Sequence, residues 1–403
     1  MAPERMPPRL VRLRGANGRA HYAAVTADAD GVPAELVDLA GLVPELAAPA
    51  EAGFDPAALR QALALAAAVA ADPAGARWDA HRQSLSLDEL PARLLSPLPL
   101  GQAELDRDER QVLAAGLNYG EHKAETGTRA ADLLLFVKPV APTGAYAPVP
   151  AVPLLDYEIE IGLVLLEDLD LDALPSPADL LDRVAFVLAN DVSDRAPIIL
   201  DAKTGYVRGK TRPGFLVLGP WLVPGRHLPL RLGTELGEQV LDLRLAVGRP
   251  GAAEAEPRQR ARSDEMIMGP LAILRAAAAA RTSMPDLTGR DRFLYPEDRV
   301  LKAGSLILTG TPGGTAIRAP GQLKKLSLLV RGGFTLAGAA RAYRDEQLGQ
   351  AQALGYLAPG DTVDATALTA DGGPGLGRQR WRVAGDNERV GSGAGTPQKE
   401  NSP

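Results

Sequence analysis

The apolar residues of this chain come in short runs, and this feature limits the available folds more than any other. In the main part of the sequence these runs are interrupted by Gly, Pro, Asn or Asp, as in FVLAND, GFLVLGPWLV, SLILTGT and LSLLVRGGF. Short runs bounded by turn-forming residues are typical of β-strands. Helical patterning is confined to short segments such as residues 264–281. We therefore predict a mixed, mostly β architecture with few helices.

Three regions follow one another along the 403 residues. Residues 1–105 combine strand-like runs with a helix from about Asp55 to Ala71, which starts with the common N-cap and first-turn pair Asp-Pro. We expect a small β-rich N-terminal domain there and the main domain over residues 106–385. Residues 386–403 are rich in Gly, Ser, Pro, Lys and Glu, which predicts a disordered tail.

Charge and composition exclude several classes of protein. The formal net charge is −6 and there is no block of Lys and Arg, so we expect no nucleic-acid partner. The polar stretch 248–262 is expected to be an exposed loop. The absence of Cys excludes disulfides, thiolate metal sites and a Cys nucleophile. The N-terminus lacks the apolar stretch of a signal peptide, and residues 62–71 are too few to span a bilayer, so a cytoplasmic protein without a membrane partner is expected.

Two strand-like segments carry carboxylates. The segment DYEIEIGLVL places Glu158 and Glu160 two residues apart, so both point to one face of a strand, about 7 Å apart along the backbone. A second apolar run ends at Asp191. These residues form either a solvated strand face and an ordinary turn, or a site made of oxygen ligands alone. Such a site favours Mg²⁺, Mn²⁺ or Ca²⁺ over zinc.

One of the four histidines stands in a distinctive segment, GLNYGEHKAETG. If this segment is helical, His122 and Glu125 are i,i+3 neighbours. A carboxylate beside an imidazole fixes its tautomer and raises its basicity, which suits a general base. The alternative is a chance pair on a solvated helix.

Two Gly-containing segments are candidates for binding a substrate. GYVRGKT resembles a phosphate loop, but it has three residues between its glycines instead of four and no strand leads into it, so nucleotide binding is rejected. Lys210 in this segment could still hold a substrate carboxylate or enolate as a point charge. LILTGTPGG is expected to be a strand that enters a Gly-rich turn. The N–H groups of this turn and the Thr311 hydroxyl could bind a substrate carboxylate. The alternative is a plain turn without a binding role.

Taken together and in this order, these segments resemble the fumarylacetoacetate hydrolase family. The family pattern G-L-N-Y-x-x-H-x-x-E, F-x-K-P, D-Y-E-x-E, N-D-V-S-x-R, G-K-[ST] and T-G-T-P is matched by GLNYGEHKAETG, FVKP, DYEIE, NDVSDR, GKT and TGTPGG. A final P-G-D strand is matched by YLAPGD and GLGRQRWRV. The resemblance covers about residues 110–385, and residues 1–105 look like the small domain that many members carry.

The resemblance implies a fold, an assembly and a role for nine residues. The fold is the family's mixed β-sandwich roll, usually a homodimer. The implied cofactor is Mg²⁺, or Mn²⁺ or Ca²⁺ in its place. The resemblance implies that Glu158, Glu160 and Asp191 are the metal ligands. It implies that His122 and Glu125 form the dyad that activates water, on a segment that becomes ordered over the substrate. It further implies that Lys210 and Lys138 face the substrate, and that Arg195 and Thr311 bind a carboxylate or oxyanion.

The chain departs from the family pattern in three places. After NDVSDR the common Asp and Gln are replaced by the segment Ala196-Pro197-Ile198-Ile199. After Gly-Lys-Thr the frequent Asp-x-Phe is replaced by Arg212-Pro213-Gly214-Phe215. About forty residues, roughly 315–352, are inserted after TGTPGG. These departures concern the substrate more than the metal.

The activity implied is cleavage of a C–C bond in a small 2,4-dioxo acid of the acylpyruvate type, through a metal-bound enolate. The scaffold also supports hydration or dehydration of 2-keto-3-deoxy sugar acids, decarboxylation of oxaloacetate and tautomerisation. A non-catalytic scaffold protein is a further alternative. The presence of both His122 and Glu125 favours water activation, and therefore hydrolysis of a 2-oxo acid.

Overall fold

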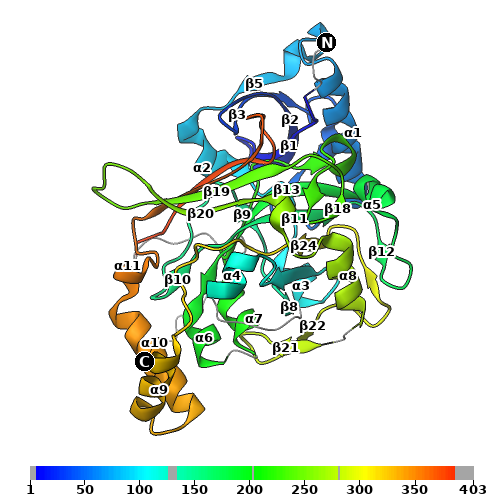
Figure 1. Ribbon diagram of the computed structural model, residues 1–403. Coiled ribbons are helices and arrows are strands. Elements are labelled where there is room, and N and C mark those ends of the chain that lie inside the picture. Colours follow the sequence, from blue (N-terminus) through cyan, green and yellow to red (C-terminus); the bar gives the residue numbers. More distant parts are fainter. Residues whose placement is uncertain (1–5, 126–133, 202–203, 280–281, 386–403) are drawn as a thin grey trace, which may run out of the picture.

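The computed structural model describes residues 6–125, 134–201, 204–279 and 282–385. The tail predicted to be disordered, 386–403, lies outside these residues. Within them, strand is more abundant than helix, and three larger sheets build the molecule (Figure 1). The prediction of a mixed, mostly β fold is therefore confirmed. None of the helices in the described ranges is long and apolar enough to cross a membrane.

The N-terminal sheet is antiparallel and lies at one end of the molecule (Figure 1). Its strand order is β5-β3-β2-β1-β6, with β4 paired to β2. Helix α1 packs on this sheet and confirms the predicted helix, because the Asp55 side chain accepts hydrogen bonds from the first helical N–H groups. The elements are β1 (Leu10–Arg14), β2 (Arg19–Ala29), β3 (Val32–Asp38), β4 (Ala47–Pro49), α1 (Pro56–Ala71), β5 (Arg82–Ser84) and β6 (Leu94–Leu95).

The central sheet has eight strands and carries the site. Its order is β8-β7-β24-β11-β13-β15-β9, with β16 paired to β13. Strands β11 and β13 are buried along their whole length, which explains why their sequences are almost continuously apolar. The strands are β7 (Val112–Gly116), β8 (Leu134–Val137), β9 (Thr143–Gly144), β11 (Ile159–Leu165), β13 (Val184–Asp191), β15 (Leu216–Leu218), β16 (Val223–Pro224) and β24 (Leu306–Leu308).

The third sheet has the order β20-β19-β25-β26 and corrects one prediction. Residues 248–262 were expected to be an exposed loop, but residues 256–262 form strand β20. The charged residues of β20 alternate with the inward-facing Gln259 and Ala261. Because β20 is an edge strand, its outer face and its free edge can carry charged side chains. The strands are β19 (Leu241–Gly248), β20 (Glu256–Arg262), β25 (Thr362–Thr369) and β26 (Gly377–Arg382).

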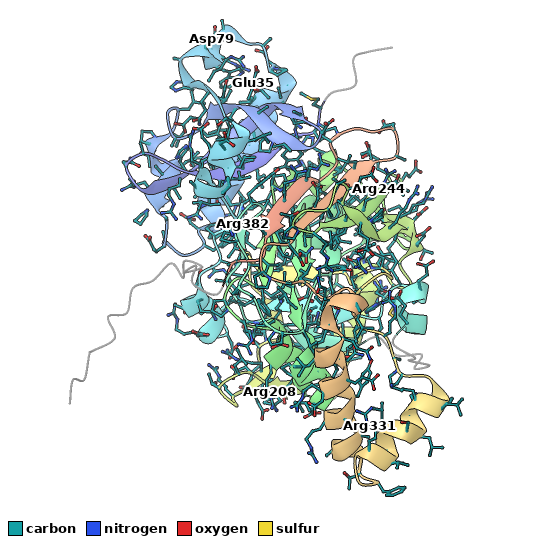
Figure 2. The ribbon with its side chains drawn as sticks, turned by 90° about the vertical axis from the view of Figure 1, so that its left-hand side faces the viewer. Glu35, Asp79, Arg208, Arg244, Arg331 and Arg382 are labelled. Atoms are coloured by element: carbon teal, nitrogen blue, oxygen red, sulfur yellow. The ribbon has the colours of Figure 1, made fainter. Side chains whose placement is uncertain are left out.

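The inserted segment, roughly 315–352, is helical, although its run LSLLVRGGF had the same short apolar pattern as the strands. It forms helix α9 (Gln322–Arg331), helix α10 (Leu336–Gly349) and the short α11 (Ala351–Leu354). Figure 2 shows this hairpin, marked by Arg331, standing away from the body of the protein. The run is helical because α9 packs against α10, which in turn packs against α6.

The remaining helices are short and lie between strands. The helix expected over 264–281 begins later, at the Gly-Pro pair before α8, because proline is suited to the first helical turn. These helices are α2 (Leu90–Arg93), α3 (Gln102–Asp106), α4 (Gly120–Glu125), α5 (Pro177–Arg183), α6 (Arg195–Leu200), α7 (Gly205–Lys210) and α8 (Pro270–Ala279). Short 3-10 helices also join the strands: η1 (Pro44–Leu46), η2 (Ala76–His81), η3 (Leu87–Glu89), η4 (Gly225–His227) and η5 (Ser263–Glu265). The other strands form two-stranded ribbons: β10 (Leu155–Asp156) with β14 (Ser193–Asp194), β12 (Leu169–Asp170) with β23 (Val300–Leu301), β17 (Arg231–Leu232) with β18 (Glu235–Leu236), and β21 (Ser283–Pro285) with β22 (Asp291–Phe293).

Candidate metal centre and active site

Three carboxylates converge at the centre of the eight-stranded sheet. Glu158 immediately precedes β11, Glu160 is the second residue of that strand, and Asp191 ends the neighbouring strand β13. Each of the three offers an oxygen, and these oxygens lie within 4.8 Å of one another. The side chains are buried, with 5%, 1% and 0% of their residue surface exposed. The alternative of a solvated strand face is therefore excluded for Glu158 and Glu160.

Three buried cations surround these carboxylates. The Lys210 Nζ lies 2.6 Å from a Glu158 oxygen and 2.8 Å from an Asp191 oxygen. The Lys138 Nζ lies 2.7 Å from the other Asp191 oxygen. Arg195 contacts Glu158 at 2.6 Å and the buried Asp156 at 2.8 Å. The structure therefore brings these predicted substrate-facing residues to the carboxylates themselves.

Glu158 and Glu160 have different electrostatic environments. Burial raises the pKa of Glu158, but Lys210 and Arg195 outweigh this effect and lower it below the usual range. Burial also raises the pKa of Glu160, and the neighbouring charges of Asp191 and Glu158 raise it further. Glu160 accepts a hydrogen bond of 2.8 Å from the Gly310 N–H. Negative charge is thus least compensated at Glu160.

The cluster fits a divalent cation. Among the described residues, the buried carboxylates at the centre outnumber the buried cations by one; they are Asp156, Glu158, Glu160 and Asp191 against Lys138, Arg195 and Lys210. Convergent carboxylate oxygens are the ligands that Mg²⁺, Mn²⁺ and Ca²⁺ prefer. The residues that would hold such an ion are Glu158, Glu160 and Asp191.

The predicted histidine–glutamate pair lies beside this centre. The His122 Nδ1 lies 3.7 Å from a Glu125 oxygen, both on helix α4. Glu125 also accepts the Gly314 N–H at 3.0 Å and lies 3.4 Å from Arg318, which belongs to the inserted segment. Burial alone raises the pKa of Glu125, but His122, the Gly314 N–H and Arg318 together lower it below its ordinary value. Glu125 is therefore an ionised partner for the imidazole.

Thr311 follows β24 in the Gly-rich turn and is buried. Its hydroxyl accepts a hydrogen bond of 2.8 Å from Gln259, whose side-chain oxygen accepts the Ile159 N–H at 3.0 Å. Gln259 therefore links the turn to the start of β11. Sequence analysis missed this residue because it placed Gln259 in a loop; the alternation of β20 was the signal available.

Asp156 was also missed as a site residue, although it stands in the matched DYEIE segment. It is fully buried, and besides Arg195 it accepts the Ala316 N–H at 2.9 Å. The period of two that pairs Glu158 with Glu160 also includes Asp156, so the alternation could have found it.

A small cavity joins the two parts of the site. Its volume is about 40 Å³, room for about three water molecules. Binding a larger molecule therefore requires lining side chains to move apart. Its polar lining residues are His122, Glu158, Arg195, Lys210 and Thr311, and the remainder of its wall is formed by Ala115, Gly116, Leu117, Leu134, Phe136, Ile198, Tyr206 and Ile317.

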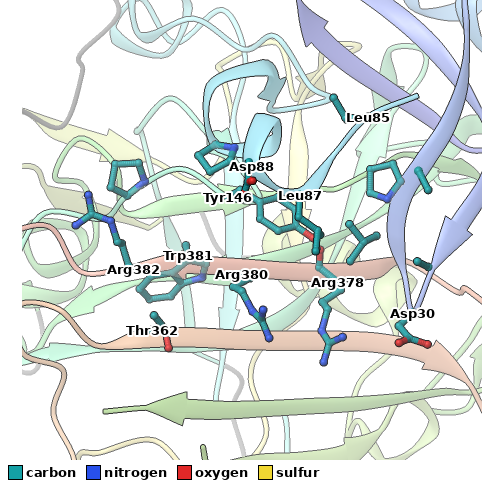
Figure 3. A pocket seen from close by; sticks show the side chains of 16 residues that line it. Asp30, Leu85, Leu87, Asp88, Tyr146, Thr362, Arg378, Arg380, Trp381 and Arg382 are labelled. Atoms are coloured by element: carbon teal, nitrogen blue, oxygen red, sulfur yellow. The ribbon is translucent and has the colours of Figure 1, made fainter. Parts of the chain in front are cut away.

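A much larger cavity, of about 790 Å³, lies elsewhere, between the N-terminal sheet and strand β26 (Figure 3). Apolar residues such as Leu87 and Trp381 line it together with Arg378 and Arg380. Both arginines are bound to Asp364. The carboxylate cluster and His122 are not among its lining residues, so size alone does not make it the candidate active site.

A buried oxygen-ligand centre beside a histidine–carboxylate pair, on a mostly β scaffold, defines the class of protein to which this chain belongs. Residues 111–384 match the family model described as "Fumarylacetoacetate (FAA) hydrolase C-terminal". The chain is a member of the fumarylacetoacetate hydrolase family and an enzyme of that superfamily. A search of curated proteins finds no match.

Solved structures share the fold over almost the whole chain. They include a probable 2-hydroxyhepta-2,4-diene-1,7-dioate isomerase from Mycobacterium abscessus, with 22% identity, a TM-score of 0.53 and coverage of 93% of this chain and 98% of that chain. The fumarylacetoacetate hydrolase from Exiguobacterium antarcticum has 20% identity, a TM-score of 0.52 and coverage of 93% and 99%. A 5-carboxymethyl-2-hydroxymuconate delta-isomerase from Mycobacterium smegmatis has 20% identity, a TM-score of 0.51 and the same coverage. At these identities the likeness concerns the fold.

Proposed function

We propose that the protein is a metal-dependent hydrolase that cleaves a C–C bond of a small 2,4-dioxo acid of the acylpyruvate type. The observation that carries this proposal is that one cavity is lined both by His122, with its ionised partner Glu125, and by Glu158 of the carboxylate cluster. Decarboxylation and tautomerisation need no activated water, so a supported imidazole at this position favours hydrolysis.

A divalent cation held by Glu158, Glu160 and Asp191 would supply Lewis acidity to the substrate's carboxylate and 2-oxo oxygens. Lys210 and Arg195 line the same cavity and would hold negative charge on the substrate as it develops. Thr311 adds a hydroxyl that can donate to a carboxylate.

His122 would act on water. Its imidazole takes a proton as the water oxygen bonds to the 4-carbonyl carbon, and Glu125 stabilises the imidazolium that results. The bond between C3 and C4 then breaks, and its electron pair passes to C3 and the 2-oxo oxygen. Returning the proton to C3 gives pyruvate, and the acyl part leaves as a carboxylic acid.

The test is a substrate panel with purified protein and Mg²⁺. Acylpyruvates, oxaloacetate and 2-keto-3-deoxy sugar acids should be compared, with products identified by chromatography. We expect stoichiometric pyruvate and carboxylic acid from acylpyruvates. Turnover of the sugar acids or of oxaloacetate alone would show instead a dehydratase or a decarboxylase on the same scaffold.

The assembly and location also stay proposals. We propose a homodimer in the cytoplasm, as the family resemblance and the sequence suggest. Light scattering at micromolar concentration tests the assembly, because a monomer mass would contradict it.

A further inference from the structure

The cations that line the active-site cavity are all engaged by carboxylates of the protein. Lys210 lies at hydrogen-bond distance from Glu158 and Asp191, and Arg195 from Glu158. Arg318, near the dyad, faces Glu125. Each cation that lines this cavity, among the described residues, therefore already has a carboxylate of the protein as its counter-charge.

The charge of the centre leads to the same conclusion. The buried carboxylates exceed the buried cations by one, so a bound divalent ion leaves a single positive charge in excess. One substrate carboxylate neutralises that charge. A second carboxylate would be buried without a counter-charge, which is strongly unfavourable in a closed site.

Two of the chain's departures from the family pattern contribute apolar side chains to the wall of the active-site cavity. Ile198, on α6, belongs to the segment 196–199 that replaces the family's common Asp and Gln, and Ile317 belongs to the inserted segment; both line the cavity. Ile198 packs tightly against α7, since a Cβ at Gly209 would lie 3.0 Å from its side chain. Helix α10 of the insertion packs on α6. The insertion therefore both contributes to this wall and supports it.

We propose that the substrate carries an uncharged, apolar group beyond its 4-carbonyl, and that Ile198 and Ile317 select this group. The preferred substrates are then 4-alkyl- or 4-aryl-2,4-dioxobutanoates, and dicarboxylic analogues are discriminated against. This inference rests on the proposed function, because it assumes that a 2-oxo acid binds at the carboxylate cluster.

The test uses unreactive oxamates, which present a carboxylate and an adjacent carbonyl as a 2-oxo acid does. N-phenyloxamate and N-butyloxamate carry an apolar group, and N-(carboxymethyl)oxamate carries a second carboxylate. Dissociation constants are measured by calorimetry on the Mg²⁺-loaded protein. We expect the apolar oxamates to bind at least about tenfold more tightly, a ratio typical of discrimination in an apolar pocket.

Substitution then assigns the preference to residues. Ile198→Gln should reduce the preference for the apolar oxamates several-fold. The matched control is Leu200→Gln on the same helix, which is 40% exposed and absent from the cavity lining, and should leave the ratio unchanged. Ile317→Gln provides a second variant if Ile198→Gln does not fold, and thermal unfolding of each variant verifies its folded state.

The outcomes separate this inference from the proposed function. If none of the oxamates binds, the assignment of a 2-oxo acid to this site fails. If N-(carboxymethyl)oxamate binds as tightly as the apolar oxamates or more tightly, the 2-oxo acid assignment stands and the apolar selectivity is wrong. If the preference is present but unaltered in both Ile variants, the role of Ile198 and Ile317 is wrong.

Discussion

Glu160 differs from Glu158 in what surrounds its carboxylate, although only Ile159 separates the two residues in the sequence. Glu158 is held by Lys210 and Arg195, whereas the pKa of Glu160 is raised by burial and by the charges of Asp191 and Glu158. The ionised Glu160 carboxylate is repelled by Asp191 and Glu158 unless a cation is bound between them. Glu160 is therefore expected to contribute to metal binding and to destabilise the metal-free protein.

Glu160→Gln tests this expectation. The amide oxygen can still accept the Gly310 N–H, but the charge is gone. Because unit charges about 4 Å apart interact by about 4 kcal/mol at an effective dielectric near 20, Mg²⁺ affinity should fall at least about 100-fold. The melting temperature of the metal-free variant should rise, since repulsion is removed. Calorimetric titration and thermal unfolding measure both, with the exposed Glu121→Gln as control. Unchanged Mg²⁺ affinity would exclude Glu160 as a ligand.

His122→Ala tests the water-activating role. Loss of a general base typically lowers the rate by about 10²–10⁴. We expect kcat on an acylpyruvate to fall by that factor and KM to stay within a few-fold, because Lys210 and Arg195 are unaltered. Decarboxylation of oxaloacetate should be much less affected. His227→Ala, an exposed histidine far along the chain, is the control. Undiminished acylpyruvate cleavage by His122→Ala would falsify the hydrolase assignment.

At this scale the sequence predicted the residues whose position depends on local periodicity. Alternation placed Glu158 and Glu160 on one face, and i,i+3 spacing placed His122 near Glu125. The alternation of β20 marks Gln259 as an inward-facing strand residue, but its partners Ile159 and Thr311 are distant in sequence. Ile317 had no local signal, because the fold alone brings it to the cavity.

At the scale of elements, local sequence signals were sufficient to predict some helices but not others. The N-cap signal at Asp55 predicted the start of α1 correctly, because capping involves only the next few residues. The run LSLLVRGGF gave no such signal. Its helical state depends on packing of α9 against α10 and of α10 against α6, contacts that a short apolar run does not encode.

Asp55→Ala should weaken the N-terminal unit. The Asp55 carboxylate accepts the N–H groups of Ala57 and Ala58 at 2.8 and 3.2 Å and is otherwise exposed. Loss of such a cap costs about 1 kcal/mol of unfolding free energy. Urea unfolding measures the change. Asp55→Asn, which keeps the acceptor, should recover most of the loss; equal destabilisation by Asn and Ala would contradict the capping role.

Gly338→Ala should open the α9–α10 hairpin. A Cβ at Gly338 would lie 1.8 Å from the Gly332 carbonyl oxygen, so the turn between the helices must shift. We expect about 1–3 kcal/mol of destabilisation, as for other overpacked sites, and faster hydrogen exchange in α9. Gly349→Ala lies on the same helix with open space around its Cβ, and should stabilise by about 0.5–1 kcal/mol. Unaltered exchange in α9 of the Gly338 variant would contradict the close approach.

Across the whole molecule, the N-terminal sheet is joined to the body by backbone pairing. Leu10 in β1 and Leu222 beside β16 exchange two hydrogen bonds, of 3.0 and 2.9 Å, and the Arg378 N–H of β26 donates to the Gly31 carbonyl at 2.9 Å. The apolar runs of a sequence indicate its separate domains but not the hydrogen bonds between them, so these connections could not be predicted. The domain boundary near residue 105 stays a prediction. They imply that the two parts unfold together.

Arg9 offers a test of this coupling. Its side chain is fully buried, pairs with Asp28 of the N-terminal sheet and lies 4.9 Å from the ring of Trp221 in the body. Arg9→Ala leaves Asp28 without its counter-charge and should cost about 3 kcal/mol. Because both parts depend on this contact, calorimetry should show one transition shifted to lower temperature, with equal calorimetric and van't Hoff enthalpies. Arg14→Ala, at the exposed end of β1, should change stability by less than about 0.5 kcal/mol. Two separate transitions in the Arg9 variant, with only the first shifted, would show that the N-terminal sheet unfolds independently of the catalytic body.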